Sequence, residues 1–246
     1  MNVLEVQGLC KTYPGFRLDN VSFSVAPGSI MGFIGRNGAG KTTTLKSLLH
    51  IVHPDAGEIR FFGLDLSAHK REIKQRIGYA GGAVDFYKRK PIRVLADVTR
   101  GFYANWDEAA YKRYMEAFSL DESKTPAQLS EGMRVKLSLT LALSHRAELL
   151  ILDEPTSGLD PVSREELLDA FTFLRDRGVA ILFSTHITSD LEKCADHISY
   201  ISKGKLLASE GMQDFLKRCA AEGAGTTLDE IMVHYEKESL YDKIAE

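Results

Sequence analysis

Residues 35–42 read GRNGAGKT, a glycine-rich octapeptide that fits the pattern G-x-x-x-x-G-K-[ST]. A short apolar run at residues 29–34 precedes it, and residues 41–52 follow with leucines at helical spacing. A strand, a glycine loop and a helix in this order are the setting in which the pattern binds nucleotide phosphates. Because the loop needs a buried strand before it and a helix after it, the octapeptide predicts an α/β core.

The residue types of the octapeptide suit a polyphosphate. Glycines let consecutive backbone N–H groups turn inward around the phosphates, and the following helix adds its positive end. The Lys41 ammonium can reach the β- and γ-phosphates, and the Thr42 hydroxyl can ligate Mg²⁺. We therefore predict nucleotide contacts from the loop and the first helical turn, namely Gly35, Arg36, Asn37, Gly38, Ala39, Gly40, Lys41, Thr42 and Thr43.

The composition is that of an ordinary soluble globular protein. The 246 residues include 31 basic and 34 acidic side chains, and 44% are apolar, so a full core can be buried. No apolar run reaches the roughly 18–20 residues of a membrane span, and the first residues lack the pattern of a secretory signal. Cys10, Cys194 and Cys219 have no metal-ligand spacing, which favours a reducing cytosol. An integral membrane protein, a disulfide scaffold and a disordered chain are thereby excluded.

Hydrophobic patterns divide the chain into a mixed core, a helical insertion and a tail. Strands are predicted at residues 2–7, 21–25 and 57–62, and residues 73–79 lead into a break at Gly81-Gly82. Helical patterns then replace strand patterns, at residues 94–103, 107–118 and 133–145. Strand character returns at 148–152 and 179–184 with a helix at 163–175 between them, which predicts parallel strands with crossover helices. A hairpin at 197–209 and a mostly helical tail complete the chain.

An acid pair supplies the second candidate part of the site. Residues 149–152 predict a buried strand, and Asp153 at its end is placed to hold the hydration shell of Mg²⁺. Glu154 follows and can polarise an attacking water. Tyr13 lies at a turn ahead of the core and is a candidate for stacking on adenine, although a lone tyrosine is more often a packing residue. No N-K-x-D loop for guanine is present.

Further motifs resemble those of the ATP-binding cassette (ABC) family. Residues 129–133 (LSEGM) resemble the LSGGQ signature, residues 155–160 (PTSGLD) resemble the D-loop, and His186 in STH matches the switch histidine. With Tyr13, the phosphate loop (Walker A) and the acid pair, these elements follow the family's order over most of the chain. In detail the chain looks like the separate ATPase subunits of bacterial ABC-2-type exporters, whose permease is another polypeptide.

The resemblance implies a fold, a reaction and partners. The fold is a P-loop NTPase core with a parallel sheet, an N-terminal antiparallel β subdomain and an α-helical subdomain inserted at about 83–146. A nucleotide-binding domain would span 1–210, and a helical C-terminal extension 211–246. The implied function is hydrolysis of ATP with Mg²⁺, coupled to export through an integral membrane permease. No nucleic acid is expected as a partner, and the expected location is cytoplasmic, on the inner face of the membrane through the permease.

The resemblance also implies a dimer, of two copies or of this chain with a second ABC ATPase, joined head to tail around two nucleotides. Ser130 and Gly132 would then contact the γ-phosphate of the partner's ATP, and Asp160 would lie at the dimer seam. His186 would contact the γ-phosphate or the attacking water and, with Glu154, would form the catalytic pair. From the residues alone, an ordinary helix cap is the favoured role for Ser130, and a lone histidine such as His186 is usually a polar loop residue.

Two departures from the family pattern affect this expectation. The family's Q-loop glutamine falls on Gly82, so Asp85 or a water would have to replace it. Glu131 and Met133 replace the usual glycine and glutamine of the signature, and Glu131 would repel a phosphate unless its side chain points outward. Slow or partner-dependent hydrolysis is therefore a second expectation.

Three functions are compatible with these motifs. The first is a transport ATPase. The second is an ABC ATPase that acts on nucleic acid or ribosomes, which the balanced charge and the single cassette disfavour. The third is a regulatory module in which nucleotide occupancy is the output. The sequence leaves the transported substrate, the choice of homodimer or heterodimer and the role of the C-terminal extension open. Lys88-Arg89-Lys90 fits a permease contact or a solvated turn equally.

Overall fold

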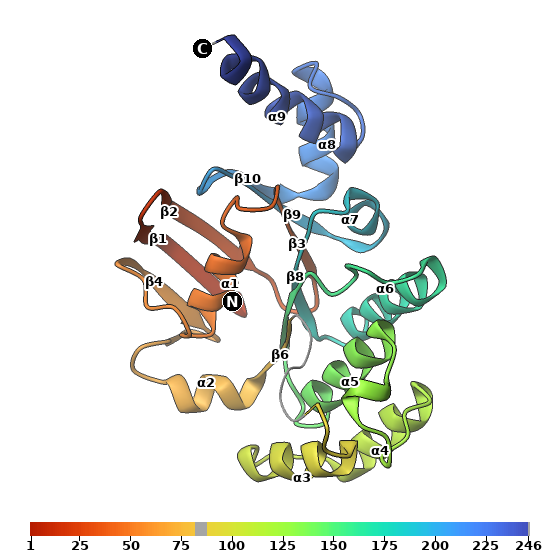
Figure 1. Ribbon diagram of the computed structural model, residues 1–246. Helices are drawn as coiled ribbons and strands as arrows, with labels where there is room; N and C mark the ends of the chain where they lie inside the picture. Colours follow the sequence, from red (N-terminus) through yellow and green to blue (C-terminus); the bar gives the residue numbers. More distant parts are fainter. Residues whose placement is uncertain (82–87, 246) are drawn as a thin grey trace.

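The computed structural model describes residues 1–81 and 88–245, with side chains described through residue 236. Gly82, the position of the expected Q-loop glutamine, and Asp85, the candidate to replace that glutamine, lie outside the described residues. The chain forms two sheets, a six-stranded sheet in the order β10-β9-β3-β8-β7-β6 and a four-stranded sheet in the order β2-β1-β4-β5 (Figure 1). Helices cover the outer face of the larger sheet, so the fold is the predicted α/β class.

The six-stranded sheet carries the functional motifs. Its parallel part consists of β3, β6, β7, β8 and β9, and β10 pairs with β9 in antiparallel fashion. The bounds are β3 (Ile30–Ile34), β6 (Ile77–Gly81), β7 (Leu149–Asp153), β8 (Ala180–Thr185), β9 (His197–Ser202) and β10 (Lys205–Gly211). The predicted strands at 29–34, 148–152 and 179–184 and the hairpin at 197–209 are confirmed.

The two faces of this sheet pack into different cores, which explains why its strands are continuous apolar runs. In β7, Leu150 and Leu152 join the core beneath the outer helices, whereas Leu149 and Ile151 join the core shared with the second sheet. All four side chains are fully buried. Asp153 follows them and is the first polar side chain of the strand.

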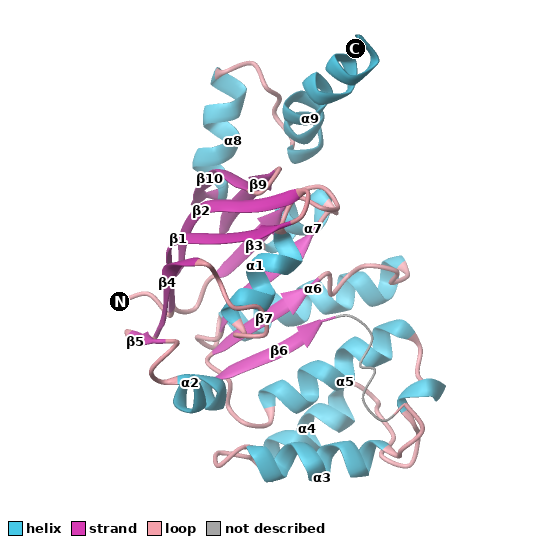
Figure 2. Cartoon of the chain, turned by 60° about the vertical axis from the view of Figure 1, so that its left-hand side comes forward, coloured by secondary structure: helices cyan, strands magenta, loops and turns pink. Residues whose placement is uncertain are grey.

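The antiparallel sheet folds around the helix that follows the phosphate loop (Figure 2). It contains β1 (Leu4–Tyr13), β2 (Phe16–Val25), β4 (Ala56–Phe61) and β5 (Leu64–Asp65), and the helix is α1 (Lys41–Leu48). Strand β1 runs to Tyr13 through register shifts that bend it, whereas the sequence pattern predicts a strand only as far as Gln7. Shifts of register interrupt the alternation of apolar residues, and the pattern ends there for that reason.

A helical lobe is packed below the sheet edge at β6 (Figure 2). It contains α3 (Ile92–Phe102), α4 (Glu108–Ala117), a short 3₁₀ turn (Pro126–Gln128) and α5 (Glu131–Leu143). These match the three helices predicted at 94–145. The lobe has its own small core of Ile92, Ala96, Tyr111, Met115, Leu129 and Leu137.

The remaining helices are α2 (Lys70–Arg76), α6 (Pro161–Arg175), α7 (Thr188–Cys194), α8 (Met212–Ala221) and α9 (Leu228–Ala245). Helix α6 and the helical tail are predicted, but α2 and α7 are not. Both have 7 residues, fewer than the two to three turns over which helical periodicity can be recognised. The predicted segment 73–79 is divided between α2 and β6. Within the described residues, no helix has both the length and the apolar character required to cross a membrane.

Candidate nucleotide-binding site

The phosphate loop connects β3 to α1 as predicted. Gly40, the residue before α1, has φ of 117°, a left-handed conformation that favours glycine. A Cβ at this position would lie 3.1 Å from atoms of Phe16, Leu18 and Ile201. Glycine therefore serves both the turn and the close packing, and the unpaired N–H groups at the start of α1 are free to bind an anion.

A hollow of about 540 Å³ opens over this loop, a volume within the range of ligand pockets in proteins. Lys41 and Arg36 are its basic lining residues among those described. The full lining is Gly15, Phe16, Arg36, Asn37, Gly38, Gly40, Lys41, Thr42, Thr43 and Glu154. Seven of the nine predicted loop residues line it; the other two, Gly35 and Ala39, lie beneath it in the buried part of the loop.

The Lys41 ammonium lies in the floor of the hollow and is 5% exposed. Its Nζ donates to the carbonyl of Gly35 at 2.6 Å and to that of Arg36 at 3.3 Å. The same atom forms an ion pair with Glu154 Oε1 at 3.2 Å. The ammonium is thus held where a phosphate in the loop would meet it.

The cation side of the site is formed by Thr42, Asp153 and Ser184. Asp153 Oδ1 accepts a hydrogen bond from the Thr42 hydroxyl at 3.3 Å and one from the Ser184 hydroxyl at 2.6 Å. Carboxylate and hydroxyl oxygens are ligands that suit Mg²⁺, which commonly takes one or two protein ligands beside phosphate oxygens and water. In the described part of the chain, no cluster of three or more His, Cys, Asp or Glu side chains offers an all-protein metal site. The donor set therefore fits Mg²⁺ that arrives with a nucleotide.

Glu154 and His186 form the other side of the site. Glu154 has φ of 51°, an uncommon conformation that functional sites often retain. Its N–H donates to the backbone oxygen of Ser184 at 3.1 Å and to the Ser184 hydroxyl at 3.0 Å. Its Oε2 lies 2.8 Å from His186 Nδ1, while Oε1 contacts Lys41. The Glu154 carboxylate therefore joins Lys41 to His186, a contact that the sequence did not predict.

The remaining implied residues do not line this hollow. The Ser130 hydroxyl accepts a hydrogen bond from Met133 N–H at 3.3 Å and caps α5, and Gly132 is buried against Ser163. Asp160 caps α6, and its Oδ2 accepts from the Ser163 hydroxyl at 2.6 Å. These hydrogen bonds hold the pKa of Asp160 below its usual value. Signature and D-loop are thus joined to each other through Ser163, apart from the chain's own phosphate loop.

At the end nearest the β1–β2 turn, the hollow is lined by Phe16, a residue that the sequence did not indicate. Tyr13 is not among the lining residues, but it pairs with Phe16 across the β1–β2 turn. Directly opposite residues of an antiparallel pair point to the same face. Tyr13 is 39% exposed, so its role in adenine stacking stays a prediction. Phe16 could have been found from its place directly after Pro14-Gly15, had the strands been predicted at full length.

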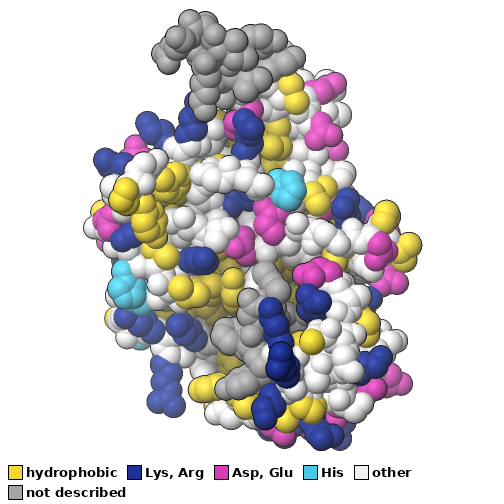
Figure 3. All heavy atoms as spheres, in the orientation of Figure 1, with side chains coloured by type: hydrophobic (Ala, Val, Ile, Leu, Met, Phe, Trp, Pro, Cys, Tyr) yellow, Lys and Arg dark blue, Asp and Glu magenta, His cyan; other side chains and the backbone are white. Residues whose placement is uncertain are grey.

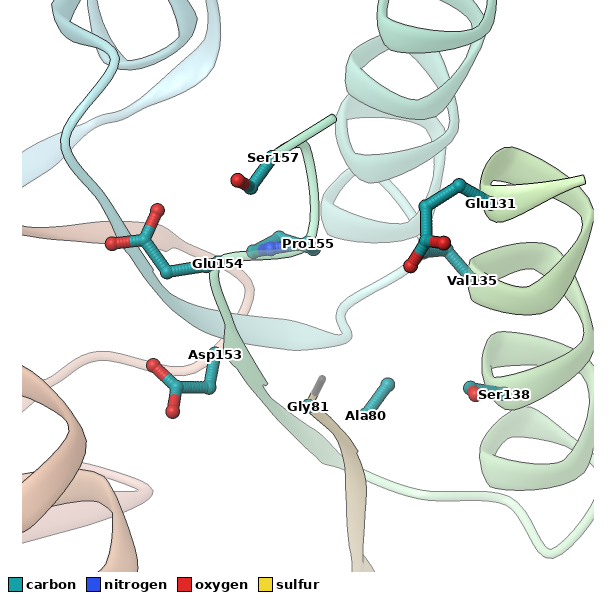
Figure 4. Close-up of a pocket in the computed structure, with 9 residues that line it drawn as sticks. All are labelled: Ala80, Gly81, Glu131, Val135, Ser138, Asp153, Glu154, Pro155 and Ser157. Carbon is teal, nitrogen blue, oxygen red and sulfur yellow. The ribbon is translucent and has the colours of Figure 1, made fainter. Parts of the chain in front are cut away.

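Glu131 lies beside a small pocket behind the acid pair, with a volume of about 30 Å³, enough for one water. In Figure 4 its carboxylate stays on the α5 side of the pocket, while those of Asp153 and Glu154 point the other way. Arg134 binds Glu131 at 3.0 Å. The pocket is lined by Ala80, Gly81, Glu131, Val135, Ser138, Asp153, Glu154, Pro155 and Ser157.

A phosphate loop after β3, a histidine after the neighbouring strand β8 and an acid pair at the end of the next strand, β7, place the chain in the class of P-loop nucleotide-binding proteins. Within that class, the ABC transporter family matches residues 18–157, more than half of the chain. The chain belongs to the ABC transporter family, as one of its ATP-binding subunits.

Similar proteins and solved structures support the same family assignment. The chain is 35% identical over 220 residues to the bacitracin transport ATP-binding protein BcrA of Bacillus licheniformis, covering 88% of this chain and 72% of that protein. It is 32% identical to the ABC transporter ATP-binding protein YtrB of Bacillus subtilis, over 83% of this chain and 70% of that one. A solved ATP-binding subunit of an ABC transporter superposes with a TM-score of 0.83 at 29% identity, covering 94% of this chain and 98% of that chain.

Proposed function

We propose that this chain binds and hydrolyses ATP and thereby powers export through a separate membrane permease. The observation that carries the proposal is the Glu154 carboxylate, which contacts both Lys41 and His186 beside the Thr42–Asp153 pair. One carboxylate in contact with the phosphate-binding lysine and with a histidine is suited to orient a water against the terminal phosphate.

Each side chain of the site has a separate role in hydrolysis. Lys41 binds the β- and γ-phosphates, and the incoming phosphate competes with Glu154 for its ammonium, which frees the carboxylate. Glu154 then accepts a proton from the attacking water, and His186 holds the carboxylate and the terminal phosphate in place. Thr42 and Asp153 would hold Mg²⁺, which when bound neutralises charge on the phosphates.

We further propose that the working unit is a head-to-tail dimer. Ser130, at the N-terminus of α5, and Asp160, in the D-loop, lie outside the hollow of their own chain. A helix N-terminus is suited to contact a phosphate, and a partner's phosphate is the one that a facing chain would present. Whether the partner is an identical copy or a second ABC ATPase is left to experiment.

The transport role rests on relatives and on charge. BcrA is a bacitracin transport protein, and a Nod factor export ATP-binding protein of Burkholderia pseudomallei is 38% identical over 78% of this chain. Basic and acidic side chains are interspersed over much of the face drawn in Figure 3, which does not favour nucleic acid. We place the protein at the inner face of the membrane through its permease. We also propose that residues 1–210 form the nucleotide-binding domain, with the helical subdomain inserted at about 83–146, and that residues 211–246 form a helical C-terminal extension.

ATP hydrolysis by the wild type, Glu154→Gln and Lys41→Ala tests the proposal. We expect Glu154→Gln to lose turnover and to form an ATP-bound dimer that elutes earlier in gel filtration. Lys41→Ala should bind nucleotide weakly, and its elution position in gel filtration should not change when ATP is added. Equal hydrolysis rates in the wild type and Glu154→Gln would contradict the proposal and favour the regulatory module.

A second experiment tests the partner. The chain is expressed with an affinity tag together with its neighbouring genes, and the membrane proteins that it binds are purified with it. We expect co-purification and substrate-stimulated hydrolysis. Purely soluble fractionation with no membrane protein bound, or association with ribosomes, would contradict the transport role.

A further inference from the structure

The C-terminal helix α9 contacts the phosphate loop, a contact that neither the family motifs nor the proposed mechanism uses. Figure 1 places α9 above the loop that precedes α1. Glu236 Oε2, on α9, lies 3.6 Å from Arg36 Nη1. Arg36 is a lining residue of the nucleotide hollow. A carboxylate 200 residues later in the chain therefore contacts one of the two described basic side chains that line the hollow.

The Glu236 carboxylate is held in place by other groups. Its Oε1 accepts hydrogen bonds from the Tyr200 hydroxyl at 3.3 Å and the Ser202 hydroxyl at 3.1 Å, both on β9. Its side chain is 14% exposed, whereas that of Arg36 is 59% exposed. The acid is thus fixed on the sheet, and the guanidinium is the movable partner of the pair.

Helix α9 is also anchored on α7, the helix that follows the switch histidine. The Thr188 hydroxyl donates to Asp229 Oδ1 at 2.5 Å, and Leu228 N–H donates to Glu192 Oε1 at 2.7 Å. These contacts fix the start of α9, and Glu236 lies two turns later along it. One helix therefore contacts both the phosphate loop and the element behind His186.

The ion pair between Arg36 and Glu236 is weak. At 3.6 Å the two atoms are beyond hydrogen-bond distance, and an exposed guanidinium is screened by water. A polyphosphate in the hollow carries several negative charges and offers Arg36 charge-assisted hydrogen bonds. Phosphate and Glu236 therefore compete for the same guanidinium.

We propose that Glu236 is a positioning residue of the nucleotide site, which holds the Arg36 guanidinium on α9 until a nucleotide binds and releases it to the phosphates. The inference rests on the proposed ATP binding and adds a residue and a helix to it.

Binding of fluorescently labelled ATP and ADP to full-length Glu236→Gln tests this role. Glutamine keeps an acceptor for Tyr200 and Ser202 but removes the charge that restrains Arg36. We expect ATP affinity to rise about three- to tenfold and ADP affinity to rise less, because ADP carries one phosphate fewer. The gain should shrink at high salt. Glu210→Gln, which removes a carboxylate that binds Arg218 instead, is the matched control and should bind like the wild type.

The Arg36→Ala background separates positioning from a structural effect. There, Glu236→Gln should no longer change ATP affinity. Unchanged affinity in Glu236→Gln, or a gain that persists in Arg36→Ala, would overturn the inference while ATP binding itself stands. A wild type that binds no ATP would overturn both.

Discussion

Ser184 joins the two acids on which the site depends. Its buried hydroxyl donates to Asp153 and accepts the N–H of Glu154. It thus orients the candidate metal ligand and fixes the unusual backbone of the candidate base with one atom. Sequence reasoning placed Ser184 in a motif but gave it no role, because its partners lie on β7 and only the pairing of β7 with β8 brings them together.

We expect Ser184→Ala to lower the turnover number about tenfold, the effect of a lost charge-assisted hydrogen bond of about 1.5 kcal/mol. The midpoint of thermal unfolding should change much less, because the strand keeps its apolar packing. Steady-state ATP hydrolysis and differential scanning calorimetry measure the two effects. Ser189→Ala, an exposed serine on α7, is the control. A normal turnover number in Ser184→Ala would show that Asp153 and Glu154 need no such bridge.

His145, in the turn that follows α5, is expected to make stability depend on pH. Its ring stacks on Tyr103 at 3.7 Å with 5° between the planes, and burial lowers its pKa to about 4. The unfolded chain binds a proton near pH 6.5 and the folded chain only near pH 4, so stability falls as the pH drops through this window.

Between pH 7 and pH 5 the wild type should therefore lose roughly 2 kcal/mol of unfolding free energy through this residue. His145→Phe keeps an aromatic ring for the stack and has no proton to bind. Urea unfolding of both proteins at pH 7 and pH 5 gives the comparison. Parallel losses in the two proteins would mean that His145 does not titrate in this window.

At the scale of elements, the β9–β10 turn connects the phosphate loop to the antiparallel sheet. Gly204 N–H donates to the carbonyl of Ala39 at 2.9 Å, and its own carbonyl accepts from Asp19 N–H at 2.8 Å. A Cβ at Gly204 would lie 1.8 Å from the carbonyl oxygen of Arg17. The turn can make both contacts only with glycine at this position.

Gly204→Ala should destabilise the protein by about 3 kcal/mol, from left-handed strain and overpacking together, and should weaken ATP binding through Ala39. Gly178→Ala provides the control, since Gly178 has φ of 87° with nothing within 4 Å of an added Cβ. The control should lose only about 1 kcal/mol, with normal ATP binding. Chemical unfolding and nucleotide titration of the two variants measure stability and ATP binding. Equal losses of unfolding free energy in Gly204→Ala and Gly178→Ala would show that the contact with the Arg17 carbonyl adds nothing.

The elements that could be predicted from the sequence are those that local interactions specify, and the missed ones depend on contacts between distant segments. The apolar run of β7 and the glycine loop before α1 specify their structures locally, and both are confirmed. Helix α7 is too short for a pattern, and β1 is extended past Gln7 by pairing with β2. The contacts of Glu154 with Lys41 and of Glu236 with Arg36 join segments more than a hundred residues apart, so no local pattern encodes them.

At the scale of the whole molecule, the phosphate loop and the signature helix of one chain do not share a hollow. The loop faces the antiparallel sheet, whereas α5 belongs to the helical lobe at the other edge of the large sheet (Figure 2). If each site needs both, then each site needs two chains, with a two-fold arrangement that gives both sites the same composition.

Mixing two inactive variants tests this arrangement. Lys41→Ala damages the loop, and Ser130→Arg blocks the exposed start of the signature helix, so each homodimer should be inactive. A hybrid dimer contains one site with both defects and one site with neither. An equal mixture of the purified proteins, exchanged without nucleotide and then given ATP, should therefore regain about a quarter of wild-type hydrolysis. Because sites completed within one chain gain nothing from mixing, a mixture as inactive as its components would contradict the shared site.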